Sequence, residues 1–220
     1  MVTASVTLGA AVGVFGISFG VGAVSAGATV LQACAMSLLV FTGASQFSAV
    51  SVIGAGGSTA SALGGAMVLA ARNGVYGLTM GRRIEGPVAR RLVAAQLTID
   101  ESTAMSVAQE DVAAQRAAFW ITGLSVYVFW NIGTLLGALL GNAIDPRTFG
   151  LDAAFPAGFV FMAWPLLRTP RGRIAAALGS AICLALVPFT PVGVPILCSA
   201  LAVLVGLPDD ERWPDRRPAQ

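Results

Sequence analysis

Long apolar stretches, each close to the length of a membrane-spanning helix, follow one another along this chain. A helix that crosses the hydrocarbon core of a bilayer needs about 20 mostly apolar residues. By this measure the sequence predicts about seven spans, over residues 6–24, 29–53, 59–80, 117–140, 152–167, 174–188 and 192–207. We therefore expect an all-α, polytopic integral membrane protein.

Polar residues gather mainly in two segments, residues 81–115 and 208–220. We predict a single transmembrane transporter domain over residues 1–207, interrupted by a polar cytoplasmic segment at 81–115. Residues 208–220 are rich in proline and charge, which favours a disordered cytoplasmic tail. Within the first segment, residues 92–108 mix polar and apolar positions and are compatible with a re-entrant or interfacial helix.

Arginines follow the third, fifth and seventh predicted spans, and the loops at the other ends carry almost none. The three clusters are Arg82, Arg83, Arg90 and Arg91; Arg168, Arg171 and Arg173; and Arg212, Arg216 and Arg217. Basic loops stay on the cytoplasmic side of a membrane. The clusters therefore predict that the N-terminus lies outside and the C-terminus lies in the cytoplasm.

Composition agrees with a membrane protein, because 56% of the 220 residues are hydrophobic and only 11% are charged. Soluble domains carry about 25% charged residues. A net charge of +2 does not favour nucleic-acid binding. The chain has no histidine, its three cysteines lie in separate apolar stretches, and no nucleotide-binding loop or Ser/His/Asp arrangement is present. We expect no metal site, no cofactor and no enzymatic activity.

Arg72 is the most unusual residue, because it lies near the middle of the third predicted span. A guanidinium at the bilayer centre costs at least about 2.5–3.5 kcal/mol, so it normally faces protein, water or a ligand. One alternative is that Arg72 snorkels to the cytoplasmic interface, which lies about 15 Å away near Arg82. The other is an ion pair with Asp100 or Glu101, or with a substrate carboxylate.

Two further motifs have open interpretations. Gly43, Ala44, Ser45 and Gln46 lie within the second span, where small residues either allow close helix packing or break the helix. A break would expose backbone N–H groups to an anionic ligand. Thr98 to Ser102 is either plain loop or the source of a counter-charge or proton-coupling site.

Neighbouring polar residues are candidates for the same site. Asn73 follows Arg72 directly, and Tyr76 shares its helix face one turn later. Asn131, next to Trp130 in the fourth span, is expected to form an interhelical hydrogen bond.

Three motifs, in this order and spacing, resemble the AzlC-type branched-chain amino acid exporters: residues 43–47 (Gly-Ala-Ser-Gln-Phe), 72–77 (Arg-Asn-Gly-Val-Tyr-Gly) and 98–101 (Thr-Ile-Asp-Glu). Residues 150–156 are similar to the family's stretch before a later helix. The resemblance, which covers residues 1–207, implies the large subunit of a bacterial inner-membrane exporter. It also implies a small hydrophobic AzlD-type partner subunit and export of valine and analogues such as azaleucine.

The chain departs from the family pattern at Asn73, where the family usually has histidine. A histidine-dependent proton step is therefore excluded, which directs attention to Asp100 and Glu101.

The resulting hypothesis is a secondary transporter that exports valine, leucine and isoleucine, coupled to the proton gradient. Its substrate-binding residues would be Gly43, Ser45, Gln46, Arg72, Asn73 and Tyr76, and its coupling or ion-pair residues Asp100 and Glu101. The alternatives are a membrane scaffold or assembly subunit that transports nothing, and a channel for small solutes.

Overall fold

The computed structural model describes residues 1–143, 160, 163–164 and 166–206, and all regular structure within these residues is helical. The elements that it contains are α1 (Val2–Ser25), α2 (Val30–Leu39), α3 (Ala44–Gly54), α4 (Thr59–Gly81), α5 (Val88–Gln96), α6 (Asp100–Val107), α7 (Val112–Ala143), η2 (Leu166–Arg168), α9 (Pro170–Leu186), α10 (Val194–Ser199) and η3 (Ala200–Gly206). The all-α prediction is confirmed for this part of the chain.

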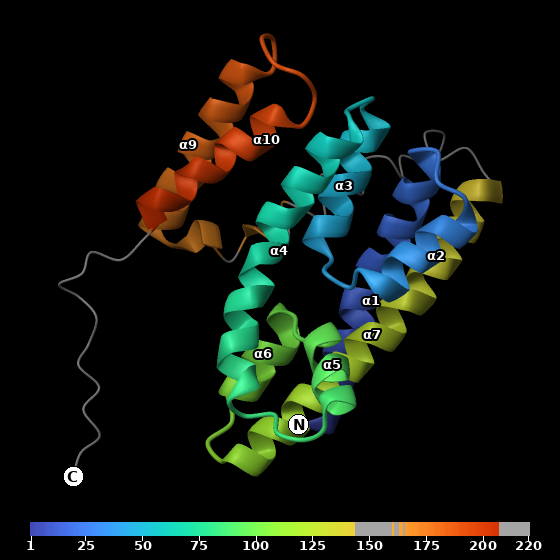
Figure 1. Ribbon diagram of the computed structural model, residues 1–220, viewed down its shortest axis with the longest axis vertical. Helices are drawn as coiled ribbons and strands as arrows, with labels where there is room; N and C mark the ends of the chain where they lie inside the picture. Colours follow the sequence, from blue (N-terminus) through green and yellow to red (C-terminus); the bar gives the residue numbers. More distant parts are fainter. Residues whose placement is uncertain (144–159, 161–162, 165, 207–220) are drawn as a thin grey trace.

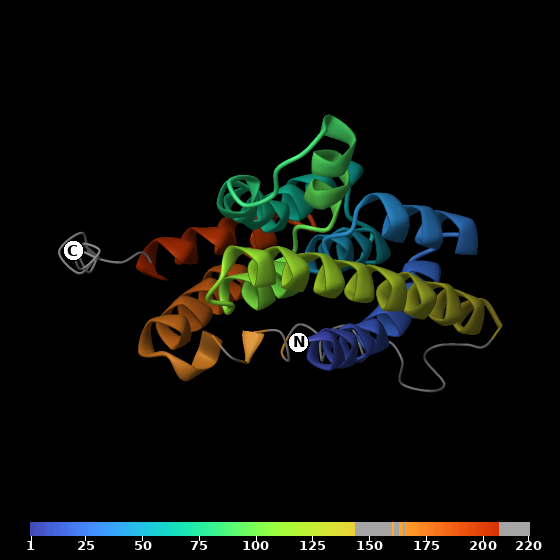
Figure 2. The same cartoon turned by 90° about the horizontal axis from the view of Figure 1, so that it is seen from below.

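Helices α1 and α7 lie side by side along most of their length and form the main scaffold (Figures 1 and 2). Glycines on both helices allow this approach. A Cβ atom at Gly16 would lie 2.6 Å from the Trp130 carbonyl oxygen, and one at Gly137 would overlap the Ile17 carbonyl oxygen. Small residues at such positions let helix backbones pack closely in lipid. We call this contact the glycine seam.

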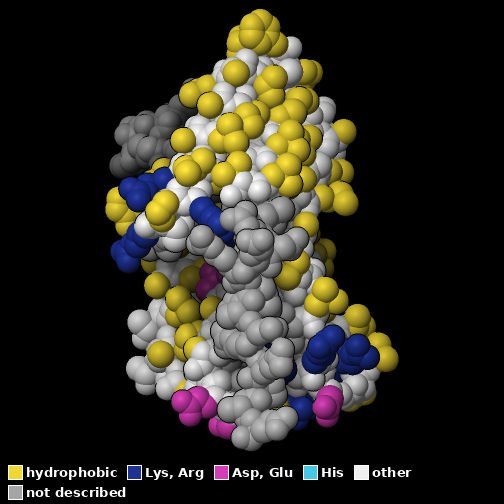
Figure 3. Space-filling view, turned by 90° about the vertical axis from the view of Figure 1, so that its left-hand side faces the viewer, with side chains coloured by type: hydrophobic (Ala, Val, Ile, Leu, Met, Phe, Trp, Pro, Cys, Tyr) yellow, Lys and Arg dark blue, Asp and Glu magenta, His cyan; other side chains and the backbone are white. Residues whose placement is uncertain are grey.

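Two of the described helices, α1 and α7, are both long enough and apolar enough to cross a membrane. Helix α4 has 23 residues, about 34 Å of helix, but Arg72 and Asn73 interrupt its apolar sequence. Hydrophobic side chains cover much of the upper part of the face in Figure 3, whereas acidic side chains gather near its lower end. The number of spans and their orientation stay predictions.

The second predicted span, residues 29–53, is divided into α2 and α3 by residues 40–43. Gly43 adopts a positive φ of 41°, a backbone conformation that residues with a Cβ atom rarely adopt. The carbonyl groups at the end of α2 are satisfied from elsewhere. The Leu38 carbonyl accepts hydrogen bonds from Gln96 Nε2 at 2.9 Å and from Tyr127 Oη at 3.1 Å. The helix-break interpretation is therefore the one that the structure supports.

Residues 81–115 contain two short helices, α5 and α6, joined by a buried turn at Leu97, Thr98 and Ile99. The Ser102 hydroxyl donates to the Leu97 carbonyl at 2.7 Å and accepts from the Ile99 N–H at 3.1 Å. Helix α6 packs against α7 and touches α4. The interpretation of residues 98–102 as plain loop is therefore wrong, because they fold into the helical body.

The C-terminal part differs in places from the prediction. Helix α9 has 17 residues and covers most of the sixth predicted span. The seventh predicted span, residues 192–207, is not one α-helix: α10 has six residues and the 3-10 helix η3 follows it. Most of the fifth predicted span, the motif at 150–156 and the tail at 208–220 lie outside the described residues.

Candidate functional site

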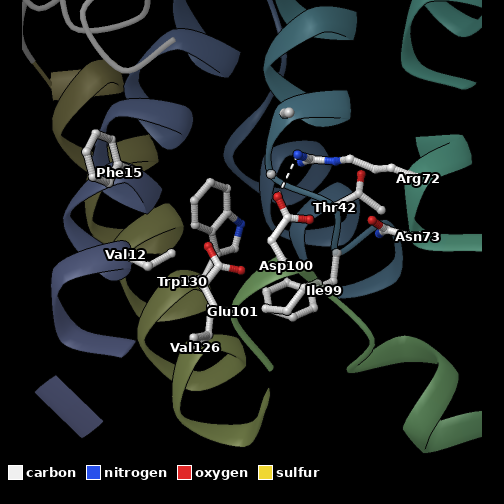
Figure 4. Close-up of a pocket in the computed structure, with 13 residues that line it drawn as sticks. Val12, Phe15, Thr42, Arg72, Asn73, Ile99, Asp100, Glu101, Val126 and Trp130 are labelled. Carbon is white, nitrogen blue, oxygen red and sulfur yellow. Dashed lines mark ion pairs between the residues drawn. The ribbon is translucent and has the colours of Figure 1, made fainter. Parts of the chain in front are cut away.

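A cavity of about 110 Å³ lies where α1, α3, α4, α6 and α7 approach one another (Figure 4). The residues that line it come from each of these helices and from the break before α3: Val12, Phe15, Phe41, Thr42, Gly43, Ala44, Arg72, Asn73, Ile99, Asp100, Glu101, Val126 and Trp130. All three sequence motifs therefore contribute to one place, although they are separated by up to 58 residues along the chain (from Gly43 to Glu101).

An ion pair between α4 and α6 forms one wall of the cavity. Arg72 Nη1 lies 2.6 Å from Asp100 Oδ2, and the two side chains are 37% and 36% exposed. Tyr76, one helical turn after Arg72, also interacts with the Asp100 carboxyl group. Arg72 therefore contacts Asp100, one of the two acidic residues that the sequence offered as its partner.

Glu101 is the second carboxylate of this wall. It follows Asp100 in the first turn of α6, where the positive end of the helix dipole favours an acidic side chain. Figure 4 shows its side chain on the side of Trp130, whereas Asp100 is directed toward Arg72. Glu101 forms no ion pair with any described residue. The cavity therefore combines one guanidinium with two carboxylates.

Several buried polar atoms at the cavity have no hydrogen-bond partner among the described residues. They are Thr42 Oγ1, Arg72 Nε and Trp130 Nε1, and each belongs to a residue that lines the cavity. A buried donor or acceptor without a partner costs about 1–3 kcal/mol, so such groups generally bind water or a ligand. Two of these three groups, the arginine and tryptophan N–H groups, can only donate, which favours a ligand that carries acceptor oxygens.

The N-terminus of α3 adds backbone donors to the same side. Gly43 is its N-cap residue, and no side chain caps the helix there. Gly43 and Ala44 both line the cavity, so the start of α3 opens onto it. Uncapped N–H groups at the start of a helix favour an anionic group.

Apolar side chains complete the cavity. Val12, Phe15, Phe41 and Val126 line it. An aromatic cluster holds the Trp130 ring in place, because Phe19 stacks on it with ring centroids 6.0 Å apart and Phe47 meets it edge-on at 6.0 Å. The Trp130 side chain is 4% exposed. The site thus has an ionic wall, an N–H-rich side and an apolar side.

Three of the predicted substrate-binding residues, Ser45, Gln46 and Tyr76, are not among the residues that line the cavity. Gln46 is fully buried, and its Nε2 donates to the Met36 carbonyl at 3.2 Å, so it joins α3 to α2 across the helix break. The Ser45 hydroxyl and Gln46 Oε1 are buried and have no hydrogen-bond partner in the part of the chain that the structure describes. Of the predicted residues, Gly43, Arg72, Asn73, Asp100 and Glu101 do line the cavity.

Sequence reasoning missed Thr42, Phe41 and Trp130 as site residues. Asn131 does not form the expected interhelical hydrogen bond with any described residue; its Nδ2 donates to the Tyr127 carbonyl of its own helix at 2.8 Å. A signal for Thr42 was its position directly before Gly43, since the residues that flank a helix break line the resulting opening.

Comparisons with known proteins agree with these motifs. The family model described as AzlC protein matches residues 7–144, which include every residue that lines the cavity. Two relatives, both named "Uncharacterized membrane protein", come from Helicobacter pylori strains ATCC 700392 / 26695 and J99 / ATCC 700824. Each is 28% identical over 177 residues, which cover 78% of this chain and 77% of the relative. No solved structure matches the chain.

Proposed function

This chain belongs to the AzlC protein family, and we propose that it is a secondary transporter that exports branched-chain amino acids across a bacterial inner membrane. Family membership and the relatives named as membrane proteins support a function related to membrane transport. The substrate, the proton coupling and the partner subunit described below belong to the proposal.

The observation that carries the proposal is the composition of the cavity wall. Arg72 on one side and Asp100 with Glu101 on the other are complementary to a carboxylate and an ammonium group. The apolar side chains of Val12 and Phe15 complement an aliphatic side chain. A zwitterion with a branched hydrocarbon side chain satisfies all three surfaces.

The proposed site gives little discrimination among valine, leucine and isoleucine. The apolar side of the cavity makes no directional contact that would distinguish ligands by their number of methylene groups. One methylene changes the binding free energy by only about 1–3 kcal/mol. We therefore expect these amino acids to compete with one another, with affinities that differ by no more than about 10–200-fold.

Glu101 is the residue to which we assign the coupling proton. Asp100 is engaged by Arg72, whereas Glu101 has no ion-pair partner among the described residues. The charged and titratable groups around Glu101 are Asp100, Arg72 and Tyr76. If both carboxylates are ionised, the cavity holds one negative charge in excess (+1 − 2 = −1), and a proton on Glu101 would neutralise it.

A small hydrophobic AzlD-type subunit is the proposed partner. Helix α4 carries large apolar side chains that are exposed in the isolated chain, including Leu63 at 58%, Met67 at 71% and Leu78 at 76%. Such a face suits contact with lipid or with another membrane helix. We propose that the transporter works as a complex of the two subunits.

Uptake of labelled valine into inverted membrane vesicles tests this function. The chain is co-expressed with its small subunit, and accumulation is compared with and without a proton gradient. We expect saturable, gradient-dependent accumulation that Arg72→Ala reduces at least about tenfold. A tenfold reduction corresponds to a loss of only 1.4 kcal/mol of binding free energy. Glu85→Gln is the matched control, because it breaks the exposed Arg116–Glu85 pair outside the cavity.

The results separate the alternatives. A wild-type rate in Arg72→Ala, at normal expression, would remove Arg72 from the site. Flux that neither saturates nor depends on the gradient would indicate a channel. Because Arg72 and Asp100 are in direct contact, a scaffold subunit with a permanent pair is a second candidate. It predicts that exchanging the two residues restores folding while no transport is found with any partner.

A further inference from the structure

We propose that substrate binding exchanges the partners of the Arg72–Asp100 ion pair. The carboxylate of an α-amino acid replaces Asp100 on the Arg72 guanidinium, and the released Asp100 carboxylate takes the α-ammonium group. This inference rests on the proposed function. It defines the substrate class as zwitterions that carry both charges on one carbon atom, and it excludes the corresponding oxo acids and amines.

The separation of the pair leads to the exchange. The carboxylate and ammonium of an α-amino acid are bonded to the same carbon, so the protein groups that bind them must be close neighbours. Arg72 and Asp100 are such neighbours, but Nη1 and Oδ2 are only 2.6 Å apart, the distance of a direct charge-assisted hydrogen bond. No ligand atom fits between these two atoms, so a substrate carboxylate that takes the Nη1 donor of Arg72 must displace Asp100 from it.

The surroundings of the pair make opening feasible. Both side chains are more than one-third exposed, and they lie at the cavity wall rather than in the packed interior. Opening the pair in the presence of substrate also leaves neither charge alone, because each group gains a charged partner on the ligand.

The donors without a partner among the described residues belong to residues that line the cavity. Arg72 Nε is buried and has no partner among the described residues, so the Asp100 contact leaves this donor unused. Trp130 Nε1 and Thr42 Oγ1 belong to residues that line the same cavity, and neither atom has a hydrogen-bond partner in the described part of the chain. A carboxylate has two oxygens with about four acceptor positions, so it can satisfy several of these donors at once, whereas Asp100 in its present position satisfies none of them.

The exchange also links substrate binding to helix contacts. Arg72 belongs to α4 and Asp100 is the first residue of α6, and theirs is the ion pair that joins these helices within the described residues. Replacing it with two ligand-mediated contacts changes how α4 is held against α6. The same event that selects a zwitterion therefore loosens the direct connection between two helices of the transporter.

Binding of three probes that share the same branched hydrocarbon group, (CH3)2CH–C, tests the exchange. Valine has both charges, 3-methyl-2-oxobutanoate lacks the ammonium, and isobutylamine lacks the carboxylate. Affinities are measured on the full chain, with its small subunit retained, in lipid nanodiscs. We expect the wild-type protein to bind valine at least about tenfold more tightly than either analogue, because each analogue leaves buried polar groups unpaired.

Two variants should change these preferences in opposite directions. In Asp100→Asn the guanidinium is released from its ion pair, so the oxo acid should bind more tightly than to wild type while valine binds less tightly. In Arg72→Gln the amine should gain affinity and valine should lose it. Glu85→Gln should leave all three affinities unchanged, since it breaks an ion pair outside the cavity.

Equal affinities for the three probes in the wild-type protein would overturn the exchange, and this test does not depend on any variant folding. A parallel loss of valine and oxo acid binding in Asp100→Asn would also overturn it. So would a gain in oxo acid binding that appears in Glu101→Gln but not in Asp100→Asn. In these cases saturable valine transport would leave the proposed function standing. Failure of the folded wild-type complex to bind or transport any α-amino acid would overturn both.

Discussion

The glycine seam and the cavity are built from the same kind of apolar, small-residue sequence, yet they are packed in opposite ways. At the seam, backbones meet so closely that a Cβ atom at Gly16 or Gly137 has no room, and the buried hydroxyls of Ser5 and Thr122 form a hydrogen bond of 2.8 Å across it. At the cavity, α3 begins after a helix break, and Thr42 and Trp130 have buried polar atoms that no described residue pairs with.

This difference indicates that the two regions have different roles, one as a packed scaffold and the other as a binding site. Packed backbone and paired hydroxyls in the seam give a scaffold without space for solvent or ligand. Unpaired polar groups cost free energy, so their concentration at one cavity marks the place where a bound molecule would supply the missing partners. Four experiments, described from the largest expected effect to the smallest, test this division.

Filling the seam should have the largest effect on stability. We expect Gly137→Ala to destabilise the protein by about 1–3 kcal/mol, because the added Cβ overlaps the Ile17 carbonyl oxygen. Gly74→Ala in α4 is the matched control: nothing lies within 4 Å of its Cβ position, so it should stabilise by about 0.5–1 kcal/mol. Unfolding midpoints in the same detergent measure both. Equal effects of the two variants would contradict the rigid-seam description.

Neutralising Glu101 should act on the cavity and leave the scaffold intact. We expect Glu101→Gln to lower gradient-driven valine accumulation at least about tenfold, a change of 1.4 kcal/mol, while valine still binds. The physical reason is that an amide cannot carry the coupling proton. Accumulation in inverted vesicles, with and without a pH gradient, measures the effect. Undiminished gradient dependence in this variant would place the coupling proton on another residue.

Trp130→Phe should distinguish a role of Trp130 in ligand binding from a role in the packed scaffold. The phenyl ring keeps the contacts with Phe19 and Phe47, but the unpaired indole N–H is removed. We expect valine affinity to fall about three- to tenfold, the range of one net hydrogen bond, with the unfolding midpoint nearly unchanged. Loss of stability without loss of affinity would assign Trp130 to the scaffold alone.

Tyr76→Phe should give the smallest effect. The Tyr76 hydroxyl interacts with Asp100 from outside the set of cavity-lining residues, so it positions the carboxylate rather than touching the ligand. We expect a change of about threefold or less in valine affinity. The relative affinities of valine and its oxo acid should keep their order. A reversal of that order would show that Tyr76 binds substrate directly.

The main helices could be predicted from hydrophobic length alone. The expected spans 6–24, 59–80 and 117–140 correspond to α1, α4 and α7, which the structure extends by a few residues at their ends. Such long apolar stretches predict helices well, because a helix that spans the lipid needs about 20 consecutive apolar residues. The seventh predicted span has the same kind of composition, but the structure divides it between α10 and η3.

The helix break could not be decided from the sequence. Gly43 and its small neighbours suit close packing as well as a break. What favours the break is the set of partners for the Leu38 carbonyl, since Gln96 and Tyr127 reach it from 58 and 89 residues away. Contacts over such separations depend on the folded arrangement and leave no local pattern.

The candidate site was predictable where charge made residues stand out. Arg72 and Asp100 were recognisable because ionised groups in apolar sequence need partners. Trp130 was not, because an aromatic residue in an apolar helix has the same appearance whether it fills a core or lines a cavity. Its position beside Glu101 becomes apparent only when α6 packs on α7.

The ion pair between α4 and α6 also has a consequence for biosynthesis. Arg72 leaves the ribosome 28 residues before Asp100 (100 − 72). If α4 spans the bilayer as the sequence predicts, it enters with an uncompensated guanidinium during that interval, at a cost of about 2.5–3.5 kcal/mol. A nascent chain arrested before residue 100 would then hold α4 loosely in the membrane, whereas one arrested beyond α6 would anchor it. The order of synthesis would thereby set the order in which these helices become committed to the bilayer.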